Sequence, residues 1–169
     1  MRNSLSSKNN LSPVPSSPTT GKHILAEFWQ CQCDPQLLTS TQPLLSLLTQ
    51  AVEQAGLTLV GHAVHEFEQY EVQKDNESDI NLKQLNQDTA PAQTSGVTLT
   101  LLLAESHLCL HTWGEYQTVT MDVYVCNVAN ENSSKADALF NACLQLFQPK
   151  QHHVNSVSRQ HQIPNNFQH

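Results

Sequence analysis

Basic residues are scarce in this chain of 169 residues: eight Lys and Arg stand against 15 Asp and Glu, for a formal net charge of −7 at pH 7. Such a surface offers no attraction to nucleic acid or anionic membranes, so neither is expected as the main partner. No apolar run approaches the length of a membrane span, and residues 1–22 lack the apolar core of a secretory signal. Five cysteines, an odd number without disulfide-type spacing, favour a reducing cytoplasm.

Hydrophobic residues make up 38% of the chain, a low share for a fully globular sequence. The deficit lies in polar stretches. Residues 1–21 are rich in Ser, Pro and Asn and predict a disordered leader. Residues 70–94 are charged and rich in Asn and Gln and predict a mobile loop, and residues 161–169 predict a frayed tail. The length fits one domain, which we place at residues 22–160.

Short alternating runs predict strands, and runs with helical spacing predict helices. The expected strands cover residues 23–29, 57–67, 97–103, 107–113, 118–126 and 151–159. The expected helices cover residues 35–54 and 135–147. Pro43 interrupts the first helix, so it should begin near residues 40–41. Strand clusters with two helices predict an α+β fold, a two-layer α/β sandwich with both helices on one face of an antiparallel sheet.

Two neighbouring strands each carry one apolar side and one side with unusual chemistry. Alternation places these groups on the second side: His107, Cys109, His111, Trp113, Thr120, Asp122, Tyr124 and Cys126. A solvated sheet face usually carries Lys, Glu and Thr, so this side indicates a functional site or a subunit interface. A short turn joins the two strands, which favours a hairpin. One register would set Cys126 opposite His107 and beside Ser106, although alternation alone does not fix the register.

Three interpretations of this face stay open on the residues alone. His107 and His111 could bind zinc with nearby cysteines, but no paired CxxC is present, and Cys31 and Cys33 have the wrong spacing for a zinc knuckle. A Ser/His or Cys/His pair could act as a nucleophile, although Ser106 lies on no Gly-x-Ser-x-Gly elbow. The same side chains could also be packing or interface residues.

Residues 96–126 read GVTLTLLLAESHLCLHTWGEYQTVTMDVYVC. This run resembles the signature of the short bacterial and archaeal S-adenosylmethionine decarboxylases, with its Ala-Glu-Ser-His core, a His-Thr-Trp-Pro-Glu segment and a Cys after an Asp-containing strand. Residues outside the run also match the family's pattern: Gly21, His23, Glu27, Cys31 and Phe67. The resemblance covers residues 21–160 apart from the loop at 70–94.

The resemblance implies a proenzyme that cuts itself between Glu105 and Ser106. Ser106 would become a covalent pyruvoyl group, which forms a Schiff base with the substrate. His111 would be the proton acceptor in processing, and Cys126 the proton donor in catalysis. No metal is implied.

The resemblance also implies a substrate, a product and a partner. S-adenosylmethionine would be converted to decarboxylated S-adenosylmethionine and CO2, in support of spermidine biosynthesis. Phe67 and Trp113 match positions that line the nucleoside pocket, and Glu115 matches one that binds ribose hydroxyls. A homodimer is implied, with active sites near the subunit interface.

The run departs from the family's pattern at several positions. Gly114 replaces a Pro, which should loosen the turn, while Gln117 and Thr118 replace a Gly-Tyr pair and Asn127 replaces a Gly. Thr98 keeps a hydroxyl where many members have Ser, so a role in supporting self-cleavage could survive. The departures leave two alternatives open: a pyruvoyl decarboxylase of ornithine or arginine, and a non-catalytic paralogue.

Overall fold

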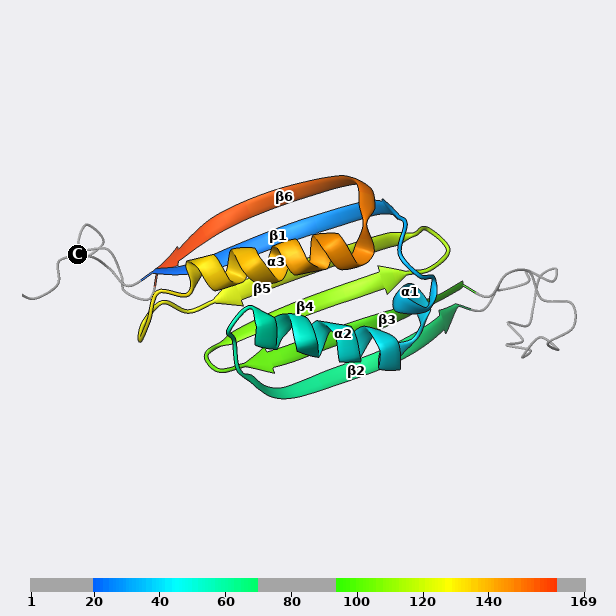
Figure 1. Cartoon of the computed structure of the whole chain (residues 1–169). Helices are drawn as coiled ribbons and strands as arrows, with labels where there is room; N and C mark the ends of the chain where they lie inside the picture. Colours follow the sequence, from blue (N-terminus) through cyan, green and yellow to red (C-terminus); the bar gives the residue numbers. More distant parts are fainter. Residues whose placement is uncertain (1–19, 70–93, 161–169) are drawn as a thin grey trace, which may run out of the picture.

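In the part of the chain that the structure describes, a single antiparallel sheet carries the helices on one of its faces (Figure 1). The computed structural model describes residues 20–69 and 94–160. Within these residues the strands are β1 (Thr20–Cys31), β2 (Leu59–Gln69), β3 (Thr94–Leu103), β4 (Ser106–Trp113), β5 (Thr118–Val125) and β6 (Pro149–Gln160). The helices are α1 (Gln36–Thr39), α2 (Thr41–Gln54) and α3 (Ser133–Phe147). The six strands lie in the order β2-β3-β4-β5-β1-β6.

The α+β class and the strand positions predicted from the sequence are confirmed. Thr20 and Gly21 lie in β1 and Thr94 in β3, although the sequence placed them in the leader and the loop. The rest of the predicted leader, of the loop at 70–94 and of the tail at 161–169 lies outside the described residues. None of the described helices has the length and apolar character needed to cross a bilayer.

The first predicted helix is divided in two. α2 begins at Thr41, as the position of Pro43 predicted, since a proline is tolerated in a first helical turn where no intrahelical partner is needed for its nitrogen. The preceding residues still form the short helix α1, which the sequence analysis did not separate. Asp34 helps to start it, because its carboxylate accepts a hydrogen bond of 2.9 Å from the Gln36 N–H.

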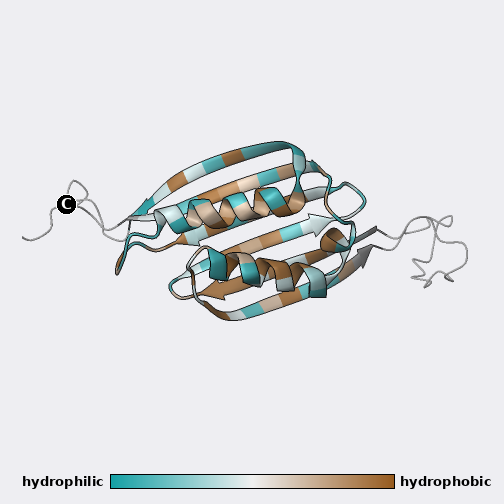
Figure 2. Ribbon diagram, in the orientation of Figure 1, coloured by the Kyte–Doolittle hydropathy of each residue, from teal (hydrophilic) through white to brown (hydrophobic). Residues whose placement is uncertain are grey.

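The hydrophobic core lies between the sheet and the two long helices. Apolar residues run along the central strands behind α2 and α3 (Figure 2). Among the described residues, Thr112 is the one buried polar side chain. Its hydroxyl donates to the Leu38 carbonyl at 2.7 Å and accepts from the Val97 N–H at 2.8 Å, so it joins α1 to β3 and β4.

The opposite sheet face is covered by no helix or strand of residues 20–69 and 94–160 (Figure 1). The strand registers place the chemically unusual groups of β4 and β5 on this face, next to His23, Leu25, Glu27 and Trp29 of β1. Leu25 and Trp29 are 37% and 40% exposed there. We call this surface the open face.

Candidate active site

A two-residue turn of Ala104 and Glu105 joins β3 to β4, with Leu103 paired to Ser106. Glu105 has a φ of 60°, in the left-handed region that side chains other than glycine rarely adopt. This conformation costs about 1–2 kcal/mol for an L-residue with a Cβ. The predicted cleavage point, the Glu105–Ser106 peptide bond, is therefore in an exposed and strained turn.

Cys126 lies beside Ser106, as the sequence analysis expected. The Cys126 N–H donates to the Ser106 hydroxyl oxygen at 3.4 Å, and Cys126 is 7% exposed. Its carbonyl accepts a hydrogen bond of 2.8 Å from the Asn132 side chain, which fixes the chain just after β5. Asn127, a departure from the family's pattern, has a structural role here, because its side-chain oxygen Oδ1 accepts a hydrogen bond of 3.0 Å from the main-chain N–H of Asn132.

The register between β4 and β5, which the sequence left open, differs by two residues from the one that would set Cys126 opposite His107. Tyr124, not Cys126, is paired with His107. A shift of two residues keeps every side chain on its predicted face, so alternation could not detect it. As a result, Tyr124 stands between His107 and Cys126 on the open face.

Asp122 accepts contacts from two histidines. Its Oδ1 lies 3.4 Å from Nε2 of His23 and 3.4 Å from Nε2 of His107. The guanidinium of Arg159 donates to Nδ1 of His23 at 3.0 Å. Since that nitrogen is an acceptor, the ring proton of neutral His23 is on Nε2 and points to Asp122.

Three ligand-type atoms of His23, His107 and Asp122 lie within 4.8 Å of one another, close enough for a metal ion. A metal on Nε2 of His23 would displace its proton to Nδ1 and break the hydrogen bond from Arg159. The geometry therefore favours a hydrogen-bonded chain. The zinc alternative from the sequence used His107 and His111 with cysteines. Of these, His107 belongs to this group, whereas His111 and the cysteines do not.

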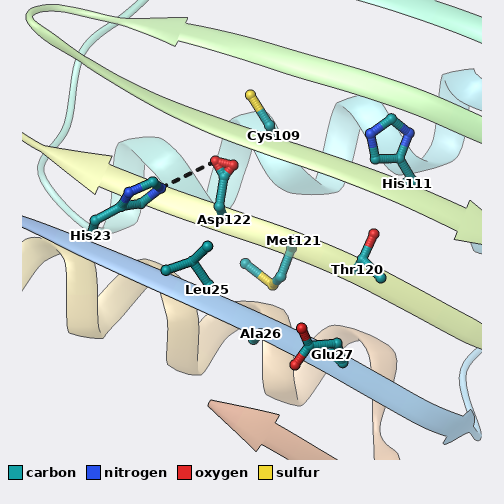
Figure 3. Close-up of a pocket in the computed structure, with 9 residues that line it drawn as sticks. All are labelled: His23, Leu25, Ala26, Glu27, Cys109, His111, Thr120, Met121 and Asp122. Carbon is teal, nitrogen blue, oxygen red and sulfur yellow. Dashed lines mark hydrogen bonds and ion pairs between the residues drawn. The ribbon is translucent and has the colours of Figure 1, made fainter. Parts of the chain in front are cut away.

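A shallow pocket of about 260 Å³ lies on the open face beside this group (Figure 3). Its lining includes Glu27, Cys109, His111 and Thr120. The Oε2 atom of Glu27 is buried and has no hydrogen-bond partner within the described ranges. Burial raises the pKa of the Cys109 thiol, which keeps this thiol neutral.

His111 is exposed and lies at a distance from Ser106 along the same strand. The two residues are five positions apart on β4, which corresponds to roughly 17 Å at the rise of an extended strand. Nδ1 of His111 is 3.0 Å from the hydroxyl of Thr98. When Thr98 accepts from Nδ1–H, Nε2 is left as the proton acceptor. One chain thus orients His111 but does not bring it to Ser106.

Phe67 and Trp113 lie near His111. Phe67 of β2 pairs with Gly96 of β3. If the register between β3 and β4 is extended by two residues, Trp113 lies opposite Gly96 on the other side. A Cβ on Gly96 would lie 2.3 Å from the Phe67 ring, so the glycine makes room for the aromatic side chain. The rings of Trp113 and His111 are 6.0 Å apart. These residues form a second cluster, at the far end of β4 from Ser106.

Glu115 is exposed in the turn between β4 and β5. Gly114 has a defined place in this turn, because its N–H donates to the Ser95 carbonyl at 2.9 Å, a bond that the family's proline could not form. A Cβ on Gly114 would approach Thr39 to 2.6 Å. The expectation that this substitution loosens the turn finds no support in these contacts.

Two functional candidates were not singled out from the sequence. Tyr124 was placed on the correct face, but its position next to His107 depended on the register. Arg159 lies on the last expected strand, and its contact with His23 joins residues 136 positions apart, which no local pattern signals.

Comparisons with known proteins identify the family. The family model for S-adenosylmethionine decarboxylase matches residues 22–75 and 70–160. A relative from Picrophilus torridus, named S-adenosylmethionine decarboxylase proenzyme, is 27% identical over 143 residues, covering 85% of this chain and 86% of the relative. A relative of the same name from Archaeoglobus fulgidus is 28% identical over 130 residues, covering 77% and 88%.

The fold is also similar to that of a solved structure. The crystal structure of the adenosylmethionine decarboxylase from Aquifex aeolicus superimposes with a TM-score of 0.61 at 23% identity, over 88% of this chain and 97% of that chain. At this identity the likeness concerns the fold alone.

Proposed function

Because the chain belongs to the S-adenosylmethionine decarboxylase family, we propose that it cuts itself between Glu105 and Ser106 and then decarboxylates S-adenosylmethionine. The products would be decarboxylated S-adenosylmethionine and CO2, and the first would supply aminopropyl groups for spermidine. The proenzyme names of its relatives support self-processing. The observation that carries the proposal is the position of the Ser106 hydroxyl, which follows the left-handed Glu105 and contacts the Cys126 N–H at 3.4 Å.

The cleavage begins as an attack of the Ser106 oxygen on the Glu105 carbonyl carbon, which converts the amide into an ester. The strain at Glu105 favours this step, because cleavage releases the turn from its left-handed conformation. The Cys126 N–H donates a hydrogen bond to the Ser106 hydroxyl and so helps to orient it. A base must then remove the α-proton of residue 106, and His111 is the candidate. The ester C–O bond breaks, and the Glu105 carboxylate leaves as the end of the first fragment. Water replaces the nitrogen of the resulting dehydroalanine, which is lost as ammonia, and a pyruvoyl group remains.

Position 106 suits a covalent pyruvoyl group. It is the first residue of β4 and is paired with Leu103 of β3. An exposed turn precedes it, so the two new chain ends can move apart after cleavage. Such a group supplies the electron sink for loss of CO2. Ser106 would hold it, and Cys126 would deliver a proton to the substrate α-carbon from a site that is 7% exposed.

The division of the candidate residues supports a homodimer. Ser106 and Cys126 lie at one end of β4, whereas His111, Phe67 and Trp113 lie at the other end. In a two-fold assembly of open faces, each end meets the opposite end of the second copy. The partner's His111 would then serve Ser106, and Leu25 and Trp29 would lose their exposure to water.

The aromatic cluster suits a cationic nucleoside substrate. Phe67 and Trp113 offer aromatic faces to a sulfonium and stacking surfaces to an adenine. Glu115 is exposed in the adjoining turn, where its carboxylate could accept hydrogen bonds from ribose hydroxyls. None of the five cysteines forms a disulfide, which supports the cytoplasm as the location.

The intact mass of the denatured protein tests the proposal. We expect two fragments that meet between Glu105 and Ser106, the second blocked at its first residue, and release of CO2 from carboxyl-labelled S-adenosylmethionine. Ser106→Ala is the matched control and should remain one chain without activity. A cleaved and active Ser106→Ala protein would overturn the proposal. Release of CO2 from ornithine or arginine in place of S-adenosylmethionine would correct the substrate.

A further inference from the structure

Cys126 lies just beyond the part of β5 that the sheet holds. The pairing of β5 ends at Tyr124 on the β4 side and at Val125 on the β1 side. Two hydrogen bonds reach the main chain of Cys126: its N–H donates to Ser106 at 3.4 Å, and its carbonyl accepts from Asn132 at 2.8 Å. The first bond is long, so the second does more to fix the chain at this point.

The Asn132 side chain is not used to cap the helix that it precedes. Asn132 is the N-cap residue of α3, where an asparagine side chain usually accepts a hydrogen bond from the first helical turn, yet it makes no such bond. The Glu131 carboxylate serves that turn and accepts from the Ser133 N–H at 2.7 Å. Nδ2 of Asn132 instead donates to the carbonyls of Cys126 and Asn130, at 2.8 and 3.2 Å.

Asn127 holds the other end of the same loop. Its Oδ1 accepts a hydrogen bond of 3.0 Å from the main-chain N–H of Asn132. Its Nδ2 donates to the Ser133 hydroxyl at 2.9 Å and to the Glu131 carboxylate at 3.3 Å. The Asn127 side chain thus holds the main chain of Asn132, and the Asn132 side chain holds the main chain of Cys126. We call these two asparagines the clasp.

The clasp joins Cys126 to a rigid part of the fold. α3 places four fully buried side chains in the core: Ala136, Leu139, Cys143 and Phe147. Because protein cores are close-packed, a helix buried in this way keeps one position against the sheet. The clasp therefore fixes the Cys126 carbonyl relative to α3, at a point where the strand pairing has ended.

We propose that Asn127 and Asn132 are positioning residues for Cys126, and that the clasp keeps the thiol where it donates its proton. This inference rests on the proposed role of Cys126. In that step the S–H bond breaks, its electron pair stays on sulfur, and the proton passes to the substrate α-carbon, which holds the pair left by CO2. A solvent proton then restores the thiol. A displacement of about 1 Å can slow such a step by about a hundredfold.

The variant Asn132→Asp separates positioning from stability. It keeps the size of the side chain and the main-chain N–H that Asn127 holds, but an oxygen replaces the nitrogen that donates to Cys126. Aspartate is as good an N-cap residue as asparagine, and a negative charge is favourable at a helix N-terminus. Asn130→Asp is the matched control, because it places the same charge on an exposed side chain of the same loop and keeps the Asn130 carbonyl.

We expect kcat to fall by about tenfold or more in Asn132→Asp, with KM nearly constant, because the altered contact is to the proton donor. The midpoint of thermal unfolding should not fall, because the aspartate can cap α3. Asn130→Asp should match the natural protein in kcat, KM and unfolding. A natural kcat in Asn132→Asp, or an equal loss of kcat in the control, would overturn the inference.

A second variant tests the other half of the clasp. Asn127→Gly installs the glycine of the family's pattern and removes the acceptor of the Asn132 N–H. We expect kcat to fall by about tenfold, although the change is toward the family's residue. A kcat equal to that of the natural protein would remove Asn127 from the positioning role.

A measurement on the uncut chain distinguishes failure of this inference from failure of the proposed function. In Ser106→Ala protein with carbonyl-labelled cysteine, the NMR shift of the Cys126 carbonyl carbon reports the hydrogen bond that it accepts, and Cys126→Ala identifies the signal. Adding Asn132→Asp should move this signal to lower frequency, whereas Asn130→Asp should leave it in place. An unmoved signal would refute the clasp. An uncut and inactive natural sequence would refute self-processing, and the carbonyl shift would still test the contact.

Discussion

The separation of Ser106 from His111 predicts that two variants, each unable to cut itself, will restore cleavage when their chains share a dimer. The first variant, Ser106→Ala, keeps the base but lacks the attacking hydroxyl. The second, His111→Gln, keeps the hydroxyl but lacks the base. If the partner's His111 serves Ser106, a mixed dimer contains one complete site, and only the His111→Gln chain is cut.

The expected extent of cleavage follows from random pairing. Equal amounts of the two chains in a two-fold dimer give about half mixed dimers, so about half of the His111→Gln chains should be cut. The distance of roughly 17 Å along β4 is far beyond the reach of direct proton transfer within one chain. Cleavage within one chain would require β4 to leave the sheet.

Co-expression of the two variants with different affinity tags provides the assay. Sequential purification isolates mixed dimers, and intact mass identifies which tagged chain has been cut. Each variant purified alone is the control and should stay uncut. Mixed dimers that remain uncut would refute the shared site, and cleavage of pure His111→Gln would remove His111 from the role of base.

Three further predictions concern single side chains. Cys126→Ala should still be cut but should lose decarboxylation by about a hundredfold or more, measured as CO2 release, because the proton donor is absent. Thr98→Val should slow cleavage by about tenfold in a time course of intact mass, because His111 loses the partner that fixes its tautomer. Thr112→Val should lower the free energy of unfolding by about 2–4 kcal/mol in denaturant titrations, because two buried main-chain groups lose their partner.

The sequence predicts the parts of this fold that depend on local patterns. Alternation identifies the strands and the face of each residue, and Pro43 marks the start of α2. The Ser106–Cys126 neighbourhood also follows, since a short turn joins their strands. These features depend on periodicity and on residues near in sequence, which a single chain displays directly.

Other features depend on register and on distant pairing. A shift of two residues placed Tyr124 opposite His107 without changing any face. The pairing of β6 with β1, which brings Arg159 to His23, joins the two ends of the domain. The division of the site along β4 follows from strand length, but the members of each cluster are known only from the strand pairing.

The strand order has a consequence for the protein after cleavage. The fragment 1–105 would contain β1, β2 and β3, and the fragment 106–169 would contain β4, β5 and β6. In the sheet β3 lies against β4, and β1 lies between β5 and β6, so three strand pairs join the two fragments. Strands of the two fragments alternate in part of the sheet, so the fragments cannot separate unless these strand pairs break. A broken peptide bond therefore leaves the molecule whole, with a new chain end held in place at position 106.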